Sequence, residues 1–312
     1  MATYDNLPRA VVFTPQRGRR RSFLALTVAL ALGAIVAAVA PILSVRASTP
    51  GHVILAHHHG PTGGHDTAAR SPSLSAPSPA VSPRPSLGPT GELSRLIAMG
   101  QPIYCGAASR PLVALTFDDG PGVLTPLALK TLKQNGNALA TFFLVGKLFS
   151  VPSFVDTVKR QAAAGMAFGD HTWDHVEMTK GNTMLYQEQI SRTRKAEEHI
   201  TGQPVWFFRP PYGHHDDRLT AYVKSQHMLE IVWSLETGDA EGATSAQIVH
   251  AVKKGVSAGD IILLHDNRGT TENALPRILD IIGRRGLKPV TLPQLLRRDP
   301  PTNYQLRHHT CG

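Results

Sequence analysis

The sequence predicts an α/β fold from about residue 92 onward, a (β/α) barrel or an incomplete version of one. Short apolar stretches typical of strands alternate there with amphipathic stretches typical of helices, which indicates a parallel sheet with crossover helices. Six or seven such repeats fit into about 200 residues, a length that suits a barrel. Unusual polar residues also follow several predicted strands, at the end where barrel enzymes build their active sites.

The elements follow from apolar spacing and from turn residues. The first strand is the apolar run 112–115, bounded by Pro111 and Gly120. Thr244 and Gln247 have the spacing of a capping box, which marks the start of a helix. Further strands are expected at residues 138–145, 166–168, 206–208, 229–235, 260–264 and 288–290. Helices are expected at residues 125–134, 152–164, 183–200, 219–226, 244–256, 272–285 and 293–298.

The N-terminal part of this basic chain, whose net charge is +9, predicts a membrane segment. Residues 23–43 carry no charge and are long enough to cross a bilayer, which takes about 20 residues. The arginines at positions 17 and 19–21 would keep the preceding tail, residues 1–22, in the cytoplasm. We therefore expect a single-pass anchor in the cell membrane, with the remainder extracellular.

A cleaved signal peptide is the alternative, with Val45-Arg46-Ala47 as its cleavage site and a secreted product. Signal peptides usually have an apolar core of only about 7–15 residues, so the longer segment favours the anchor. Residues 44–91 are rich in Pro, Ser, Gly and His and lack the apolar residues needed to form a core. They predict a disordered linker leading to a domain at residues 92–312.

The chain has two cysteines, Cys105 and Cys311. In an oxidising compartment they could form a disulfide that closes a very long loop, contributing roughly 4–5 kcal/mol. Two unpaired thiols are the alternative, because sequence does not give the Cα separation. The basic residues Arg284-Arg285 and Arg297-Arg298 would suit an anionic envelope, and no nucleic-acid motif accompanies them.

Asp118 and Asp119 are two adjacent carboxylates at the end of the first predicted strand, ahead of Gly120-Pro121. Burying an unpaired carboxylate costs several kcal/mol or shifts its pKa until it is neutral. The pair therefore needs a metal, a cation or a proton, unless both side chains are solvated turn residues that cap the next helix.

His171 and His175 follow the third predicted strand at i and i+4, a spacing that would place both rings on one face of a helical turn. Thr172 stands where a zincin protease carries its general-base Glu, which disfavours that class. With one of the two aspartates, the histidines would make a three-ligand site with open positions. A hydrolytic metal needs such a site to hold a water and polarise a carbonyl.

Four motifs, in this order along the chain, resemble those of the polysaccharide deacetylase family, also called the NodB-homology family or carbohydrate esterase family four. They are Thr116-Phe117-Asp118-Asp119-Gly120-Pro121, His171-Thr172-Trp173-Asp174-His175, Arg209-Pro210-Pro211-Tyr212-Gly213 and Leu263-Leu264-His265. The resemblance covers about residues 108–298. It implies a distorted, incomplete (β/α) barrel that removes acetyl groups from carbohydrate polymers with the help of a metal.

The resemblance also implies a role for each residue of the site. Asp119, His171 and His175 would bind a divalent metal, Zn²⁺ in the first place and Co²⁺ as an alternative. Asp118 would be the general base, oriented by Arg209. His265 would be the general acid, tuned by Asp239. Substrate contacts would come from Tyr212, whose backbone N–H would help to hold the oxyanion, and from Pro210 and Leu263.

Departures from the family pattern concern the surroundings of these residues. Asp170 and Asp174 stand where Asn and Ser are more usual, and Glu236 to Ala240 replaces the usual Asp-x-x-Asp-Trp. Loss of that Trp removes an apolar wall near the acetyl or sugar pocket, which leaves substrate preference open.

The predicted function is removal of acetyl groups from N-acetylglucosamine residues of a cell-envelope polysaccharide, with peptidoglycan as the leading substrate. A chitooligosaccharide deacetylase or an acetylxylan esterase is the alternative within the enzyme class. An inactive envelope-binding barrel is the alternative outside it, although a pure binder needs neither Asp118 nor His265. The oligomeric state stays open.

Overall fold

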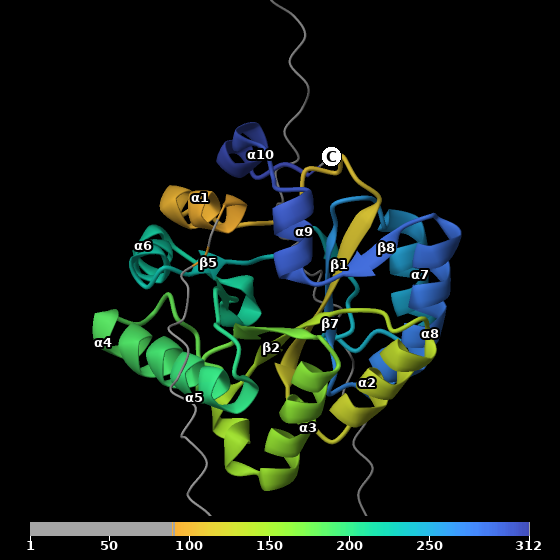
Figure 1. Cartoon of the computed structure of the whole chain (residues 1–312), viewed down its shortest axis with the longest axis horizontal. Helices are drawn as coiled ribbons and strands as arrows, with labels where there is room; N and C mark the ends of the chain where they lie inside the picture. The colour runs from red at the N-terminus through yellow and green to blue at the C-terminus, as the bar shows by residue number, and fades with distance from the viewer. Residues whose placement is uncertain (1–88, 90, 312) are drawn as a thin grey trace, which may run out of the picture. The chain divides into compact units, whose positions relative to one another are not determined.

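The structure, a computed structural model, describes residue 89 and residues 91–311. In this part of the chain one parallel sheet has the strand order β5-β4-β3-β2-β1-β7-β6, with β8 paired to β1, and helices surround it (Figure 1). The strands are β1 (Leu112–Gly120), β2 (Thr141–Leu144), β3 (Ala167–Asp170), β4 (Phe207–Phe208), β5 (Leu229–Glu230), β6 (Leu235–Glu236), β7 (Ile261–His265) and β8 (Lys288–Val290).

The helices lie between and beyond these strands. They are α1 (Glu92–Met99), α2 (Thr125–Gln134), η1 (Gly146–Ser150), α3 (Pro152–Ala163), α4 (Thr183–Tyr186), η2 (Gln187–Ser191), α5 (Arg192–Thr201), η3 (Pro211–Gly213), α6 (Asp217–Ser225), α7 (Ser245–Gly255), α8 (Gly269–Arg284), α9 (Leu292–Arg298) and α10 (Asn303–His308).

The barrel is incomplete at the position where a single strand was predicted, residues 229–235. That prediction is wrong, because the run forms two short strands, β5 and β6, at opposite edges of the sheet. Only residues 231–234 connect the two strands. Because an extended chain advances at most about 3.5 Å per residue, this connection is short. The sheet must therefore curl until its edges approach, while β5 and β6 themselves do not pair.

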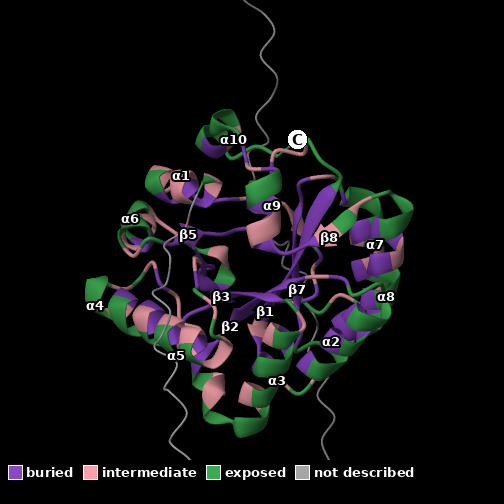
Figure 2. Cartoon of the chain, in the orientation of Figure 1, coloured by how far each residue is buried: buried purple, intermediate pink, exposed green. Residues whose placement is uncertain are grey.

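Strand β1 lies inside the sheet and is buried on both faces (Figure 2). Val113, Leu115 and Phe117 belong to a core cluster that includes residues of α2, α7 and α8, whereas Leu112 and Ala114 belong to a second cluster with α1 and α9. Burial on both faces explains why this parallel strand has a continuous apolar sequence instead of an alternating one.

Most predicted helices are present within a few residues of their expected bounds. Helix α2 spans the predicted residues, and the capping box of Thr244 and Gln247 starts α7. The expected helix 183–200 is three consecutive segments, because the π-helical η2 separates α4 from α5. Helices α1 and α10 were not predicted.

The disulfide between Cys105 and Cys311 joins the beginning of the domain to its end. The two Cα atoms lie 5.9 Å apart across a sequence separation of 206 residues. A loop of this length corresponds to a stabilisation of about 5 kcal/mol in the chain-entropy model.

The predicted tail, apolar segment and linker, residues 1–91, lie almost entirely outside the described residues. Among the helices that the structure describes, none combines the length and the apolar character needed to span a bilayer.

Candidate active site

Asp118 and Asp119 both face the pocket at the carboxyl end of β1. Successive strand residues normally point to opposite faces. Here the pairing of β1 with β2 is irregular between Phe117 and Gly120, and Asp119 has φ 68°, in the left-handed region. This turn of the backbone brings both carboxylates to one side. Asp118 is in register with His265 on the neighbouring β7.

His171 and His175 lie in a loop after β3, so the predicted helical turn is wrong. Thr172 and His175 have φ 69° and 60°, and their N–H groups donate to Asp170 Oδ1 (2.7 Å) and Thr172 Oγ1 (3.0 Å). These side-chain acceptors hold a tight loop in place of a helix. The two rings nevertheless converge, with centroids 5.0 Å apart.

Three of the predicted residues fit a divalent metal. One ligand atom from each of Asp119, His171 and His175 lies within 4.8 Å of the others. Asp119 Oδ1 is 3.1 Å from His175 Nε2 and 3.6 Å from His171 Nε2. Two ligands of one tetrahedral zinc are about 3.3 Å apart. Asp119 Oδ1 is buried and has no hydrogen-bond partner among the described residues, which fits a metal ligand.

The protonation of His171 and Asp119 suits the same role. Nδ1 of His171 is 2.8 Å from the carbonyl oxygen of Arg209, which can only accept, so Nδ1 carries the proton and Nε2 presents its lone pair. Burial lowers the pKa of His171 below its ordinary value, despite the nearby aspartates. Burial raises the pKa of Asp119, but His175 and His171 lower it by more, so this carboxyl is ionised.

Arg209 follows β4, and its side chain is fully buried. Its guanidinium donates to the carbonyl oxygen of Val232 (3.0 Å), in the stretch that connects β5 to β6. The same group donates to Asp118 Oδ1 (2.7 Å) and Thr116 Oγ1 (2.9 Å). Arg209 therefore fixes one oxygen of Asp118 and leaves the other toward the pocket.

His265 ends β7 and is held by Asp239. Nδ1 of His265 is 2.9 Å from Asp239 Oδ1, and its backbone N–H donates to Asp239 Oδ2 (2.7 Å). The Thr271 hydroxyl donates to the same Oδ2 (2.6 Å). Burial raises the pKa of Asp239, but the hydrogen bonds from His265 and Thr271 and the charge of His265 together lower it by more, so the carboxylate is ionised and the imidazole keeps Nε2 for the pocket.

The pocket has a volume of about 320 Å³ and contains most of the predicted site. Tyr212 and Leu263 line it, whereas Pro210 is buried and does not. Three further lining residues, Gly213, Glu236 and Ala240, stand in motifs noted in the sequence but were given no role there. The lining residues that were not singled out are Trp233, Glu241 and Arg268, and attention to every loop at this end of the sheet would have found them.

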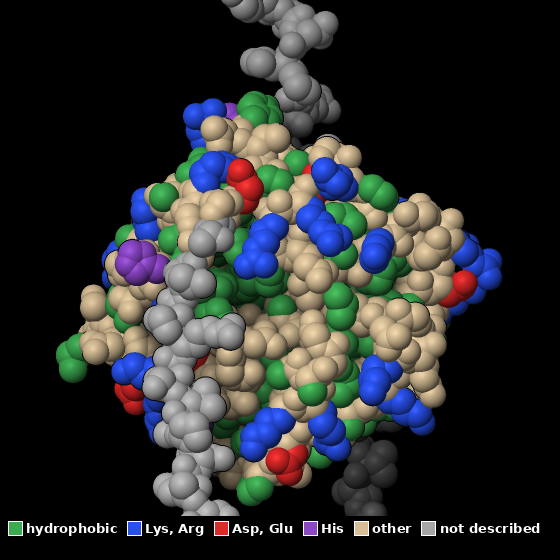
Figure 3. Space-filling view, viewed as in Figure 1, with side chains coloured by type: hydrophobic (Ala, Val, Ile, Leu, Met, Phe, Trp, Pro, Cys, Tyr) green, Lys and Arg blue, Asp and Glu red, His purple; other side chains and the backbone are tan. Residues whose placement is uncertain are grey.

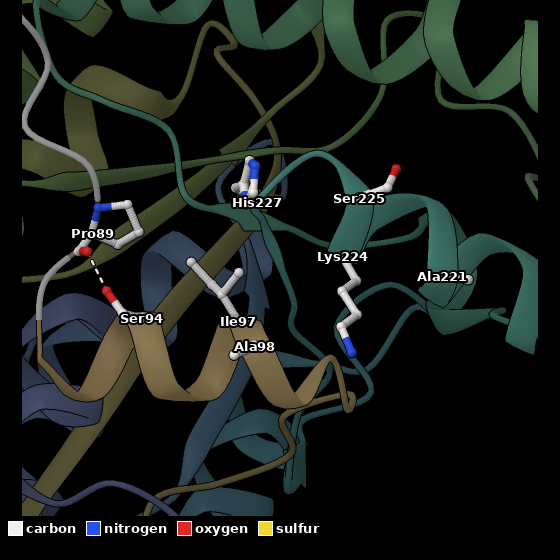
Figure 4. A pocket seen from close by; sticks show the side chains of 8 residues that line it. All are labelled: Pro89, Ser94, Ile97, Ala98, Ala221, Lys224, Ser225 and His227. Atoms are coloured by element: carbon white, nitrogen blue, oxygen red, sulfur yellow. Dashed lines mark hydrogen bonds between the residues drawn. The ribbon is translucent and has the colours of Figure 1, made fainter.

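A larger groove, of about 590 Å³, lies between α1 and α6 (Figure 4). Its lining includes Ile97, Lys224 and His227 but no carboxylate, and it shares no residue with the first pocket. Without an acid–base pair or a ligand set, it offers no hydrolytic chemistry.

A protein-family model described as polysaccharide deacetylase matches residues 106–231, up to and beyond the Arg209 motif. A peptidoglycan-N-acetylglucosamine deacetylase of Bacillus cereus is 34% identical over 199 residues, which are 62% of this chain and 71% of that protein. The chain belongs to the polysaccharide deacetylase family. The family model ends before Asp239 and His265, so these two residues rest on their geometry in the structure.

Solved structures of polysaccharide deacetylases have the same fold. A peptidoglycan N-acetylglucosamine deacetylase is 32% identical with a TM-score of 0.61, covering 66% of this chain and 97% of that structure. A pseudoenzyme of the family from Bacillus anthracis is 27% identical with a TM-score of 0.59, covering 64% and 69%. Because an enzyme and a pseudoenzyme share this fold, the fold alone does not distinguish a catalytic domain from a binding domain, and the distinction rests on the site residues.

Proposed function

We propose that this polysaccharide deacetylase is a metal-dependent hydrolase that releases acetate from N-acetylglucosamine residues of peptidoglycan. The observation that carries the proposal is the convergence of two supported proton-transfer groups, Asp118 and His265, on the pocket that also contains the three-ligand set. A binding module would not need either group.

Asp118 is proposed as the general base. Arg209 occupies its Oδ1, so Oδ2 is the atom that faces a nucleophilic water in the pocket. A base of this kind contributes when it lies within hydrogen-bond reach of the proton it removes. The buried guanidinium keeps that carboxylate in one orientation.

His265 is proposed as the general acid. Burial lowers the pKa of His265, but Asp239 and Asp118 raise it by more, to about 9, so the ring is protonated at neutral pH. Because Asp239 holds Nδ1, the proton on Nε2 is the one available to the departing amine. An amine leaves an acetamide only when it is protonated, which makes this transfer necessary.

Asp119, His171 and His175 are the residues that would hold the cation. The donor set of two imidazoles and one carboxylate suits Zn²⁺, with Co²⁺ as the alternative. A divalent cation held there would polarise the acetyl carbonyl and make water more acidic.

The Tyr212 backbone N–H is proposed to stabilise the negative charge that develops on the acetyl oxygen. Tyr212 lines the pocket, and its N–H makes no backbone hydrogen bond with the described residues. Such preorganised donors are among the strongest contributors to acyl transfer.

We further propose that the enzyme acts outside the cell membrane, anchored by residues 23–43. The Arg residues before this apolar segment and the Pro- and Ser-rich residues after it support this arrangement. Lys and Arg side chains are spread over the face seen in Figure 3, which suits an anionic envelope. Membrane fractionation with N-terminal sequencing tests the anchor, and a mature N-terminus at Ser48 in the medium would contradict it.

Acetate release decides the substrate. The purified chain should release acetate from peptidoglycan, and more slowly from chitin oligomers and acetylated xylan. Acetate release from chitin oligomers alone, or from xylan alone, would mean that this polymer is the substrate and peptidoglycan is not. No release from any polymer by the metal-loaded protein would favour the binding module.

A further inference from the structure

The loop between β4 and α6, residues 209–216, carries Tyr212 and is held from outside the pocket by two neighbouring histidines. His214 contacts Glu177, in the loop that follows His175. His215 contacts Glu230 at the end of β5. These contacts tie the loop to the loop that follows β3 and to strand β5.

His215 lies in a chain of three polar side chains that has no part in the pocket. Its Nδ1 is 3.2 Å from Glu230 Oε1, and its Nε2 is 3.1 Å from the hydroxyl of Tyr104. The Tyr104 hydroxyl can donate to Nε2 when Nδ1 carries the proton, whereas the contact of Nδ1 with Glu230 Oε1 is not a hydrogen bond, and this oxygen has no hydrogen-bond partner among the described residues. The Thr220 hydroxyl donates to the other Glu230 oxygen (2.8 Å), which fixes the orientation of this buried carboxyl beside His215.

The two histidine contacts differ in how far they are buried. The side chain of His214 is 61% exposed, and an exposed ion pair contributes little. The side chain of His215 is 22% exposed and that of Glu230 only 1%. Removing the imidazole would take away the hydrogen-bond partner of the Tyr104 hydroxyl and the neighbour of the buried Glu230 carboxyl.

Tyr104 is itself a rigid support. The next residue, Cys105, forms the disulfide with Cys311, and Ile103 pairs with Ile231 next to β5. The Tyr104 ring also packs against His309, with centroids 5.0 Å apart. His215 is thus attached to a part of the domain that is fixed by a covalent bond and by the sheet.

Tyr212 needs such support because its backbone has φ 63° and ψ 5°, a left-handed conformation that a bulky residue rarely adopts. Strained conformations persist only where the surroundings hold them. The Tyr212 ring also packs edge-on against His175, with centroids 4.9 Å apart. Arg209 fixes the loop at its start, and the half-buried His215 is its contact at the end.

We propose that His215, held between Tyr104 and Glu230, is a positioning residue that fixes the Tyr212 backbone for the deacetylation reaction. The proposal rests on the proposed role of the Tyr212 N–H. His215 acts through the loop and does not contact the substrate. Its loss therefore weakens an interaction that matters most in the transition state, so kcat falls while KM changes little.

Kinetics of the full chain with an activated acetyl ester, 4-nitrophenyl acetate, and with peptidoglycan test this role. His215→Ala should lower kcat about 10- to 100-fold on both substrates, the scale of a small misplacement of a catalytic group. Its KM should stay within about twofold of the parent value. His215→Asn places an amide N–H near the position of Nδ1 and should recover part of kcat. His250→Gln, an exposed histidine on α7, is the matched control and should match the parent.

Tyr104→Phe is the milder variant, and it keeps the ring while removing the hydroxyl. It should lower kcat about 3- to 10-fold, as expected for one hydrogen bond, without loss of bound metal or a change in the unfolding temperature beyond that of the control. Unchanged kcat in both Tyr104→Phe and His215→Ala would overturn the proposal. So would a kcat loss that only follows metal loss, or equal losses in His215→Asn and His215→Ala. If the parent hydrolyses the ester but not peptidoglycan, the proposed substrate fails while this test still stands.

Discussion

Asp239 and His265 are joined at two points, because the two carboxylate oxygens accept separately from Nδ1 and from the backbone N–H of the same histidine. This double contact fixes both the place of His265 on β7 and the tilt of its ring. It also explains the direction of the pKa. Burial alone would lower the pKa of His265, but the Asp239 contact and the Asp118 charge raise it to about 9.

Asp239→Asn should move the alkaline limit of activity. A general acid with a raised pKa works below that pKa and loses activity as the pH rises through it, here near 9. Without the Asp239 charge the pKa of His265 should fall toward or below its ordinary value of about 6.5. The alkaline limb of kcat/KM should shift to lower pH accordingly. Thr271→Val removes only the hydroxyl contact to Asp239 and is the control, in which the alkaline limb should shift less. If the alkaline limb of kcat/KM did not shift in Asp239→Asn, the Asp239–His265 pair would have no role in acid catalysis.

Asp118→Asn and His265→Ala should each lower the rate roughly 10²–10⁴-fold while fold and metal content are retained, because both groups are proposed to move protons and not to hold the metal. In the double variant the losses should be much less than additive, since the two groups serve one reaction. His265→Ala should affect an activated O-acetyl ester less than an N-acetyl sugar, because a phenolate leaves with less help than an amine. Steady-state kcat/KM on both substrates checks this, and equal losses on the two would rule out His265 as the general acid.

Removal of the metal should abolish activity, and Zn²⁺ or Co²⁺ should restore it. His175→Ala should lower metal content and activity together, because it deletes one of the three proposed protein ligands. Elemental analysis of the purified variants measures the first effect, with His250→Gln as the exposed control. Retention of about one ion per chain after loss of both His171 and His175 would place the metal elsewhere.

Much of the fold could be predicted because apolar runs and capping signals are local. The capping box at Thr244 is one example, and the same spacing at Thr291/Gln294 and Thr302/Gln305 also starts α9 and α10. The break inside residues 229–235 could not be predicted in this way. These residues form a single short run, and only the strand pairing shows that its two ends lie at opposite edges of the sheet.

The site shows the same division. Asp118, Asp119 and His265 follow from their places at strand ends, because parallel strands bring those ends together. The loop at His171–His175 was misjudged, since an i, i+4 spacing also fits a turn held by Thr172 and Asp170 side-chain oxygens. The contact of His215 with Tyr104 joins residues 111 positions apart and left no local signal.

Glu272 supplies a test of stability that is separate from catalysis. It lies in the first turn of α8, is only 4% exposed, and neither carboxylate oxygen has a hydrogen-bond partner among the described residues. Burial, assisted by the nearby Asp266 carboxyl, raises its pKa to about 8. The folded protein therefore keeps this proton over a pH range in which the unfolded chain has already lost it.

Glu272→Gln should stabilise the protein increasingly as the pH rises above about 4.5. As the pH rises from about 4.5 to about 8, the unfolded chain loses the proton first, so the parent loses stability through this window, on the order of 3–5 kcal/mol. A neutral amide removes that loss. The variant should match the parent in denaturant unfolding near about pH 5 and exceed it near about pH 9. The exposed Glu188→Gln should show no such difference, and equal stability of Glu272→Gln and parent at both pH values would mean that Glu272 ionises without cost.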